Sequence, residues 1–162
     1  MTKKDLLLTL LKESVDKCYK KDIDLIDCGM ERASVAKIHC YMVGALEYDK
    51  RFEAFSKYNL ENEYNKNGKN PKKTENFTKG AQPDIILHYR LDKPHKDNLL
   101  VVEFKSFDGK DHERDKLKLK DFTGEESGYN YFLGVFVILH IDGPEYMYFQ
   151  DGYEKPYDEL ST

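Results

Sequence analysis

The sequence lacks long hydrophobic runs and the motifs that mark several well-known kinds of site. No apolar stretch among its 162 residues is long enough to cross a membrane. Its three cysteines have no CxxC spacing, which argues against a zinc site and is typical of reduced thiols in a cytoplasmic protein. The absence of HExxH, GxSxG and a complete phosphate-binding loop argues against zinc peptidases, serine hydrolases and P-loop nucleotide-binding proteins.

An excess of positive charge is also absent. The chain has 26 Lys and Arg against 30 Asp and Glu, a formal net charge of −4. Proteins that hold nucleic acid over a whole surface are usually basic, so a nucleic-acid site here must be a local patch. Two lysine-rich stretches are candidates, although a solvated surface explains the first equally well. They contain Lys66, Lys69, Lys72, Lys73 and Lys79, and then Lys105, Lys110, Arg114, Lys116, Lys118 and Lys120.

The composition and the hydrophobic pattern predict one α/β domain over residues 1–162. The chain is 40% hydrophobic and 35% charged, without an internal repeat or a linker, which is typical of a globular domain. The order of elements predicts a three-strand meander, a helical crossover and a parallel strand, in a mixed sheet of about four to five strands flanked by helices. The predicted helices are 4–20, 30–51 and 112–122, the strands are 58–65, 84–91, 98–104, 131–141 and 146–150, and the main loops are 66–82 and 92–97.

The most informative feature is a pair of apolar runs that carry charged residues, over 82–88 and 99–105. Asp84 stands at the head of the first run, and Glu103 and Lys105 close the second. Because alternate residues of a strand share a face, Glu103 and Lys105 point to one side of the sheet. Charges that end a buried strand carry a desolvation cost and therefore call for partners.

Pairing of the two runs would bring Asp84 close to Glu103. Two adjacent carboxylates repel each other unless a cation lies between them, and Mg²⁺ prefers such oxygen ligands. A cross-strand ion pair at a solvated strand end is the alternative explanation for Glu103 and Lys105, but it leaves Asp84 unexplained. Polarity at a strand edge is sufficient to explain Glu63 and Asn65.

Glu31 heads an otherwise apolar stripe on the second predicted helix. The stripe continues with Val35, Ile38, Met42 and Ala45 at helical spacing. An acidic residue in the first turn of a helix is favoured by the helix dipole, which is one explanation for Glu31. The other explanation is that Glu31 reaches over the sheet toward Asp84 and Glu103.

These residues resemble the PD-(D/E)xK nuclease superfamily, which has the restriction-endonuclease-like fold. Pro83-Asp84 matches the PD element, Glu103-Phe104-Lys105 matches ExK, and Glu31 matches the glutamate of the first core helix. The chain is similar, more narrowly, to small uncharacterised bacterial members of this superfamily, over a core of about 30–141. That similarity is carried by Glu31-Arg32, Glu63-Tyr64-Asn65, Pro83 to His88, Asn98 to Lys105, Asp115-Lys116-Leu117 and Tyr129 to Leu139.

The resemblance implies a role for each of the matching residues. Asp84 and Glu103 would hold Mg²⁺, or Mn²⁺ as its substitute, with the carbonyl of Phe104 as a further ligand. Glu31 would be a ligand as well, directly or through water, or would support a second ion. Lys105 would orient the attacking water or neutralise the charge that develops on the phosphate. Contacts with phosphates would come from Lys116, Lys110, Lys72 and Lys73.

The expected function is a metal-dependent nuclease or endonuclease that hydrolyses phosphodiester bonds, with DNA favoured over RNA by the resemblance. Repair, defence or a mobile element would be its setting, and a homodimer or a protein partner would supply specificity. Two alternatives stay open. One is a non-catalytic nucleic-acid-binding module, and the other is a subunit of a larger nucleic-acid-processing complex.

Overall fold

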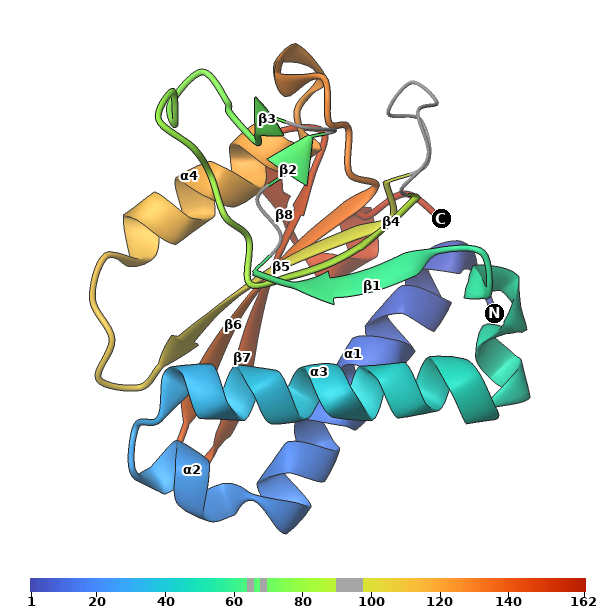
Figure 1. Cartoon of the computed structure of the whole chain (residues 1–162), viewed down its shortest axis with the longest axis vertical. Coiled ribbons are helices and arrows are strands. Elements are labelled where there is room, and N and C mark those ends of the chain that lie inside the picture. Colours follow the sequence, from blue (N-terminus) through green and yellow to red (C-terminus); the bar gives the residue numbers. More distant parts are fainter. Residues whose placement is uncertain (64–65, 68–69, 90–97) are drawn as a thin grey trace.

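A six-stranded mixed sheet forms the centre of the computed structural model, which describes residues 1–63, 66–67, 70–89 and 98–162 (Figure 1). The strand order is β1-β4-β5-β6-β7-β8, in which β5 and β6 are parallel and the other neighbours are antiparallel. A separate antiparallel pair is formed by β2 (Lys66–Asn67) and β3 (Asn70–Pro71). The strands of the sheet are β1 (Asn59–Asn62), β4 (Ile85–His88), β5 (Leu100–Ser106), β6 (Leu133–His140), β7 (Gly143–Gln150) and β8 (Tyr153–Lys155).

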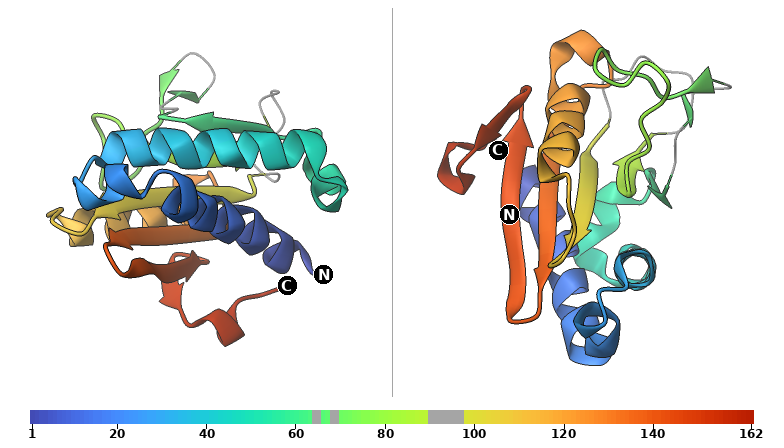
Figure 2. Two further views of the ribbon diagram at one scale, coloured as in Figure 1. Left: turned by 90° about the horizontal axis from the view of Figure 1, so that it is seen from below. Right: turned by 90° about the vertical axis from the view of Figure 1, so that its left-hand side faces the viewer.

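Helices cover both faces of the sheet (Figure 2). The N-terminal helices α1 (Lys3–Lys21), α2 (Ile23–Asp27) and α3 (Glu31–Tyr48) pack on one face, and α4 (His112–Thr123) packs on the other. Short 3-10 helices follow at Lys50–Phe55, Glu125–Ser127 and Tyr157–Glu159. No helix of the described residues is long and apolar enough to cross a membrane.

Burial on both faces explains why the central strands are continuous apolar runs. Val102 and Phe104 of β5 pack with α1 and α3, whereas Val101 lies on the α4 side. Glu103 alternates with these residues and therefore also faces α4. The fold thus places a carboxylate inside the layer between the sheet and α4, where water cannot solvate it.

The structure confirms the predicted α/β class, the antiparallel meander and the parallel crossover from β5 through α4 to β6. The predicted strand count of four to five was wrong, because β8 adds a sixth strand. This strand has three residues and little burial, so it carries no hydrophobic alternation that sequence reasoning can detect. Helix α1 contributes fully buried leucines to the core shared with α3, although it lies outside the 30–141 core that the resemblance covers.

Other boundaries also differ from the prediction. The helix expected over 30–51 ends at Tyr48, where Asp49 takes an extended backbone and begins the 3-10 helix with a side-chain cap. The strand expected over 58–65 is described as Asn59–Asn62, and the loop expected over 66–82 contains β2 and β3. Tyr64, Asn65 and Lys69, the end of the strand predicted to 91 and the 92–97 loop lie outside the described residues.

Close packing of α4 on β6 depends on Gly134. A Cβ atom at this position would lie 3.0 Å from Cγ2 of Thr123 and 3.1 Å from Cβ of Phe149. Gly134→Ala should therefore overpack this layer and lower the free energy of unfolding by about 1–3 kcal/mol. Urea denaturation of both proteins measures the change.

Gly44→Ala is the matched control for this prediction. Nothing lies within 4 Å of a Cβ atom at Gly44, which is inside α3. Alanine there should stabilise the protein by roughly 0.5–1 kcal/mol, because it restricts the unfolded chain and favours the helix. Equal effects of the two substitutions would contradict the packing explanation for Gly134.

Candidate active site

Asp84 and Glu103 meet on neighbouring strands. The register pairs Ile85 with Val102, which sets Asp84 opposite Glu103 at the start of β4. One carboxylate oxygen of Asp84, Oδ2, accepts a hydrogen bond of 2.7 Å from the backbone N–H of Phe104. The two carboxylates predicted from sequence to lie together are therefore brought together, and Asp84 is held against the backbone of β5.

Glu103 is almost completely buried, with 1% of its surface exposed. Its Oε2 accepts a hydrogen bond of 2.5 Å from the ammonium of Lys118. Its Oε1 is also buried and has no hydrogen-bond partner among the described residues. A buried acceptor without a donor is costly, and such an atom is frequently a ligand for something that the bare protein chain does not supply.

Burial perturbs the ionisation of both carboxyl groups. It raises the pKa of Asp84 from 3.8 to about 6, although the hydrogen bond from Phe104 and the charge on Lys118 act in the opposite direction. Burial and the charge on Asp84 together raise the pKa of Glu103 well above its ordinary value of 4.5. Groups perturbed in this way concentrate at functional sites, because a group tuned for catalysis needs an unusual environment.

A network of ion pairs joins these carboxylates to α4. The ammonium of Lys105 lies 2.8 Å from Oδ2 of Asp115, and the ammonium of Lys118 lies 3.1 Å from Oδ1 of the same residue. Lys118 also contacts Glu103, so it bridges an acidic residue of α4 and one of β5. Two lysines and two acidic residues therefore compensate one another, and Asp84 adds a further carboxylate nearby.

Both lysines keep their protons in this environment. Burial lowers the pKa of Lys105, but Asp115 and the charges on Glu31 and Asp84 outweigh it, so the pKa is raised. Burial also lowers the pKa of Lys118, but Glu103 and Asp115 outweigh it, so the pKa of Lys118 is raised as well. The site therefore presents two ammonium groups beside the carboxyl groups of Asp84 and Glu103 at neutral pH.

Glu31 lies beside this site, but it contacts backbone. As predicted, it opens α3 on the stripe that contains the buried residues Val35, Ile38 and Met42. Its Oε2 accepts a hydrogen bond of 2.9 Å from the backbone N–H of Ser106 at the end of β5. Glu31 therefore anchors the strand that carries Glu103 and Lys105, and its charge acts on both Asp84 and Lys105.

The four lysines predicted to contact phosphate differ in their exposure and in their contacts. Lys110 and Lys73 are exposed, as a phosphate contact requires. Lys116 faces Glu154 of β8 at 3.8 Å and Glu113 at 3.7 Å.

Lys72 is 4% exposed and lies in the interior, where its ammonium is 5.2 Å from the centre of the Tyr129 ring. Burial lowers its pKa to about 8. In this conformation Lys72 does not offer its charge to a ligand on the surface.

Sequence reasoning placed Lys118 only in the second lysine-rich stretch and Asp115 only in a segment of the resemblance, and it predicted neither residue to contact Glu103 or Lys105. Both residues are turned toward β5 because they lie on the inner side of α4 with Leu119 and Phe122, at helical spacing. The signal that points to them is an oppositely charged pair, three residues apart, that continues an apolar stripe. Lys116 belongs to the neighbouring side of α4, which explains why it does not join the network.

A second polar pair occupies the far end of β4. Nε2 of His88 lies 2.6 Å from Oε2 of Glu61 on β1. Burial and the charge on Lys72 lower the pKa of His88 to about 4. His88 lies four positions from Asp84 along the strand, about 13 Å at the usual rise, and is therefore apart from the candidate site.

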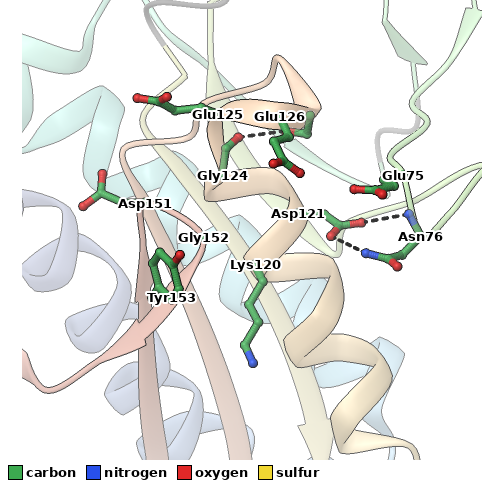
Figure 3. Close-up of a pocket in the computed structure, with 11 residues that line it drawn as sticks. Glu75, Asn76, Lys120, Asp121, Gly124, Glu125, Glu126, Asp151, Gly152 and Tyr153 are labelled. Atoms are coloured by element: carbon green, nitrogen blue, oxygen red, sulfur yellow. Dashed lines mark hydrogen bonds between the residues drawn. The ribbon is translucent and has the colours of Figure 1, made fainter.

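A surface hollow at the C-terminal end of α4 has the wrong charge for a nucleic-acid backbone (Figure 3). On one wall of the hollow, Asp121 accepts a hydrogen bond of 2.7 Å from the side-chain amide of Asn76. A phosphate would meet net negative charge there, so we do not expect the nucleic acid to enter. Its charged lining residues are Glu75, Lys120, Asp121, Glu125, Glu126 and Asp151.

The donor set at Asp84 and Glu103 fits a magnesium ion. The described residues contain no cluster of three or more His, Cys, Asp or Glu arranged as a metal site. Mg²⁺, however, usually retains several water molecules and is bound by one or two carboxylates together with phosphates of the substrate. The unpartnered Oε1 of Glu103 and the adjacent Asp84 meet this smaller requirement.

Comparison with known proteins identifies no relative. No protein-family model, no curated protein and no solved structure matches the chain. Only the geometry and chemistry of these residues therefore indicate a function.

Proposed function

We propose that the protein is a metal-dependent nuclease that hydrolyses phosphodiester bonds, with Mg²⁺ as its cofactor and DNA as its preferred substrate. The observation that carries this proposal is the half-buried Asp84 next to the buried Glu103, one oxygen of which has no partner among the described residues, beside two protonated lysines. Carboxylates for a hard cation and ammonium groups for an anion are what phosphodiester hydrolysis requires.

The arrangement of strands supports a restriction-endonuclease-like core. An antiparallel pair, β4 and β5, carries the carboxylates, and β5 continues through α4 into the parallel strand β6. This is the order in which the PD and ExK elements stand in the superfamily that the sequence resembles. The proposed core places α3 on one face and α4 on the other, with Glu31 and Lys118 at their inner sides.

Each residue of the site has a chemical role in this proposal. When bound, Mg²⁺ would activate the attacking water and stabilise negative charge on the phosphate. Asp84 and Glu103 would hold the ion, and the carbonyl of Phe104 would be a further ligand. Lys105 would orient the attacking water or neutralise charge on the phosphate, and Lys118 would add a second positive charge. Glu31 would keep β5 in place.

Exposed basic residues around the start of α4 would hold the substrate. Lys110 and Arg114 are exposed there, and the guanidinium of Arg114 lies 5.5 Å from the centre of the Phe77 ring. Because the whole chain has a net charge of −4, this basic patch is only local. We propose that a homodimer or a protein partner extends it and supplies specificity. A cytoplasmic location agrees with the three free cysteines.

One observation favours the alternative of a non-catalytic binding module or a subunit of a nucleic-acid-processing complex. Glu103 and Asp115 already have cationic partners. Lys118 contacts both of them, and Lys105 contacts Asp115. A protein that had lost catalysis would retain such a network for stability alone. Cleavage is therefore the property that separates the two functions.

The proposal is tested by assaying cleavage of linear, circular, single-stranded and branched DNA with Mg²⁺, Mn²⁺ or EDTA. We expect metal-dependent cutting by the wild type, and cutting of circular DNA would identify an endonuclease. Lys105→Met should lose cutting but retain DNA binding, whereas Lys57→Met removes an exposed charge outside both lysine-rich stretches and should retain both. Equal cutting by the wild type and Lys105→Met would exclude this site.

The position of Lys105 depends on the absence of a side chain at Gly109. A Cβ atom at Gly109 would lie 2.4 Å from Cδ and 2.5 Å from Cγ of Lys105, which is far too close. Gly109→Ala should push Lys105 away from Asp115 and reduce cleavage about 10- to 100-fold, as expected for a misplaced catalytic group. Cleavage rates and melting temperatures of this variant and of Gly44→Ala test the prediction, and unchanged cleavage by a folded Gly109→Ala would contradict it.

A further inference from the structure

Lys118 contacts one oxygen of Glu103, Oε2, beside the unpartnered Oε1 that a divalent cation would use. Its ammonium lies 2.5 Å from Oε2 of Glu103, and both side chains are largely buried. The other contact of Lys118 is with Asp115, at 3.1 Å. In the absence of a ligand, the protein thus neutralises its own acidic site.

A metal ion and this ammonium cannot both stay close to Glu103 without strong repulsion. The two cations would approach each other in a partly buried environment, where water screens charge poorly. If the ammonium simply left, it would lose a carboxylate partner without gaining another. Binding of the metal alone is therefore opposed by the protein itself.

A phosphate group provides the missing partner for the displaced ammonium. Lys118 has a flexible four-carbon stem and three N–H donors, so its ammonium can turn from Glu103 to an anion beside it while α4 stays in place. Each ligand then removes the obstacle to the other, because the phosphate accepts the lysine and the metal compensates Glu103.

We propose that Lys118 makes the binding of divalent metal and nucleic acid strongly cooperative, so that the site is loaded only when both are present. This inference rests on the proposed nuclease function, which it extends to the regulation of the same site. Cooperativity of this kind is reciprocal, and each ligand must raise the affinity for the other by the same factor.

Binding of Mn²⁺ to EDTA-treated protein, followed by electron paramagnetic resonance, tests the proposal without any reaction. The probe for nucleic acid is a phosphorothioate oligonucleotide, which resists cleavage. For the wild type we expect the oligonucleotide to tighten Mn²⁺ binding at least 10-fold, and Mn²⁺ to tighten oligonucleotide binding by the same factor. This comparison uses the unaltered protein, so it does not depend on the folding of a variant.

Lys118→Met supplies the second comparison, with Lys120→Met as the matched control on the exposed side of α4. Without oligonucleotide, Lys118→Met should bind Mn²⁺ at least 10-fold more tightly than the wild type. Adding oligonucleotide should raise the Mn²⁺ affinity of this variant only slightly. Lys120→Met should behave as the wild type. Equal Mn²⁺ affinity of folded Lys118→Met and the wild type would overturn the proposal.

The outcomes also separate this inference from the function on which it rests. If the wild type cuts DNA with Mg²⁺ but binds Mn²⁺ equally well with and without oligonucleotide, the cooperativity fails and the nuclease stands. If Mn²⁺ binds under neither condition and no substrate is cut, both proposals are overturned.

Discussion

Glu103→Gln should make the folded protein more stable while it removes nuclease activity. The substitution keeps the shape of the side chain but removes a buried carboxylate, one oxygen of which has no partner among the described residues. At pH 8 without metal, we expect stability to rise by about 1 kcal/mol, or about 2–4 °C in melting temperature. Cleavage should fall roughly 10²–10³-fold or more, the loss typical of removing one stabilising group.

This result would decide between the two explanations of Glu103. If Glu103 served only as a structural ion pair for Lys118, its replacement would leave a partly buried ammonium with one partner fewer and would destabilise the protein. A substantial loss of stability combined with full cleavage would therefore contradict the catalytic assignment. Glu126→Gln, at an exposed position on the rim of the acidic hollow, controls for the loss of one negative charge.

Asp84 should lower the stability of the metal-free protein as the pH rises from about 4 to about 6, whereas His88, whose pKa is lowered to about 4, contributes in the opposite direction. Burial raises the pKa of Asp84 from 3.8 to about 6, so in this window the folded state binds more protons than the unfolded state. Stability then decreases with pH, and the contribution of Asp84 is about 1–3 kcal/mol. The raised pKa of Glu103 acts with the same sign.

Asp84→Asn isolates this contribution, because asparagine does not titrate. Thermal or urea unfolding in EDTA at several values between pH 4 and pH 7 should show the variant gaining stability relative to the wild type as the pH rises. In the wild type, the stabilisation by added Mg²⁺ should increase with pH, because ionised carboxylates bind the ion. A difference between the two proteins that did not change with pH would contradict the assigned environment of Asp84.

The sequence predicted the centre of the site because the relevant contacts are local in a paired strand. The two-residue period of a strand places Glu103 and Lys105 on one face, and pairing of adjacent runs brings Asp84 to Glu103. Glu31 was also expected near the site, from its place at the head of an apolar helical stripe. Its contact with the backbone of Ser106 depends on the exact height of α3 over the sheet, which no local pattern records.

Contacts that depend on the packing of distant segments were not predictable. Which side of α4 meets β5 is decided by Leu119 and Phe122 in the core, and only that packing selects Lys118 over Lys116. Lys72 is buried against Tyr129, a residue 57 positions further along the chain, although its local sequence is typical of an exposed loop. The short strand β8 has no hydrophobic signal of its own.

The proposed magnesium-dependent nuclease site is tested most directly by cutting of circular DNA with EDTA-treated protein before and after Mg²⁺ is restored. Wild type and the double variant Asp84→Asn/Glu103→Gln would be purified in parallel and compared at equal concentration. We expect no cutting in EDTA, cutting by the wild type once Mg²⁺ is added, and none by the folded double variant. Cutting by both proteins, or by neither under any condition, would contradict a magnesium-dependent nuclease site at Asp84 and Glu103.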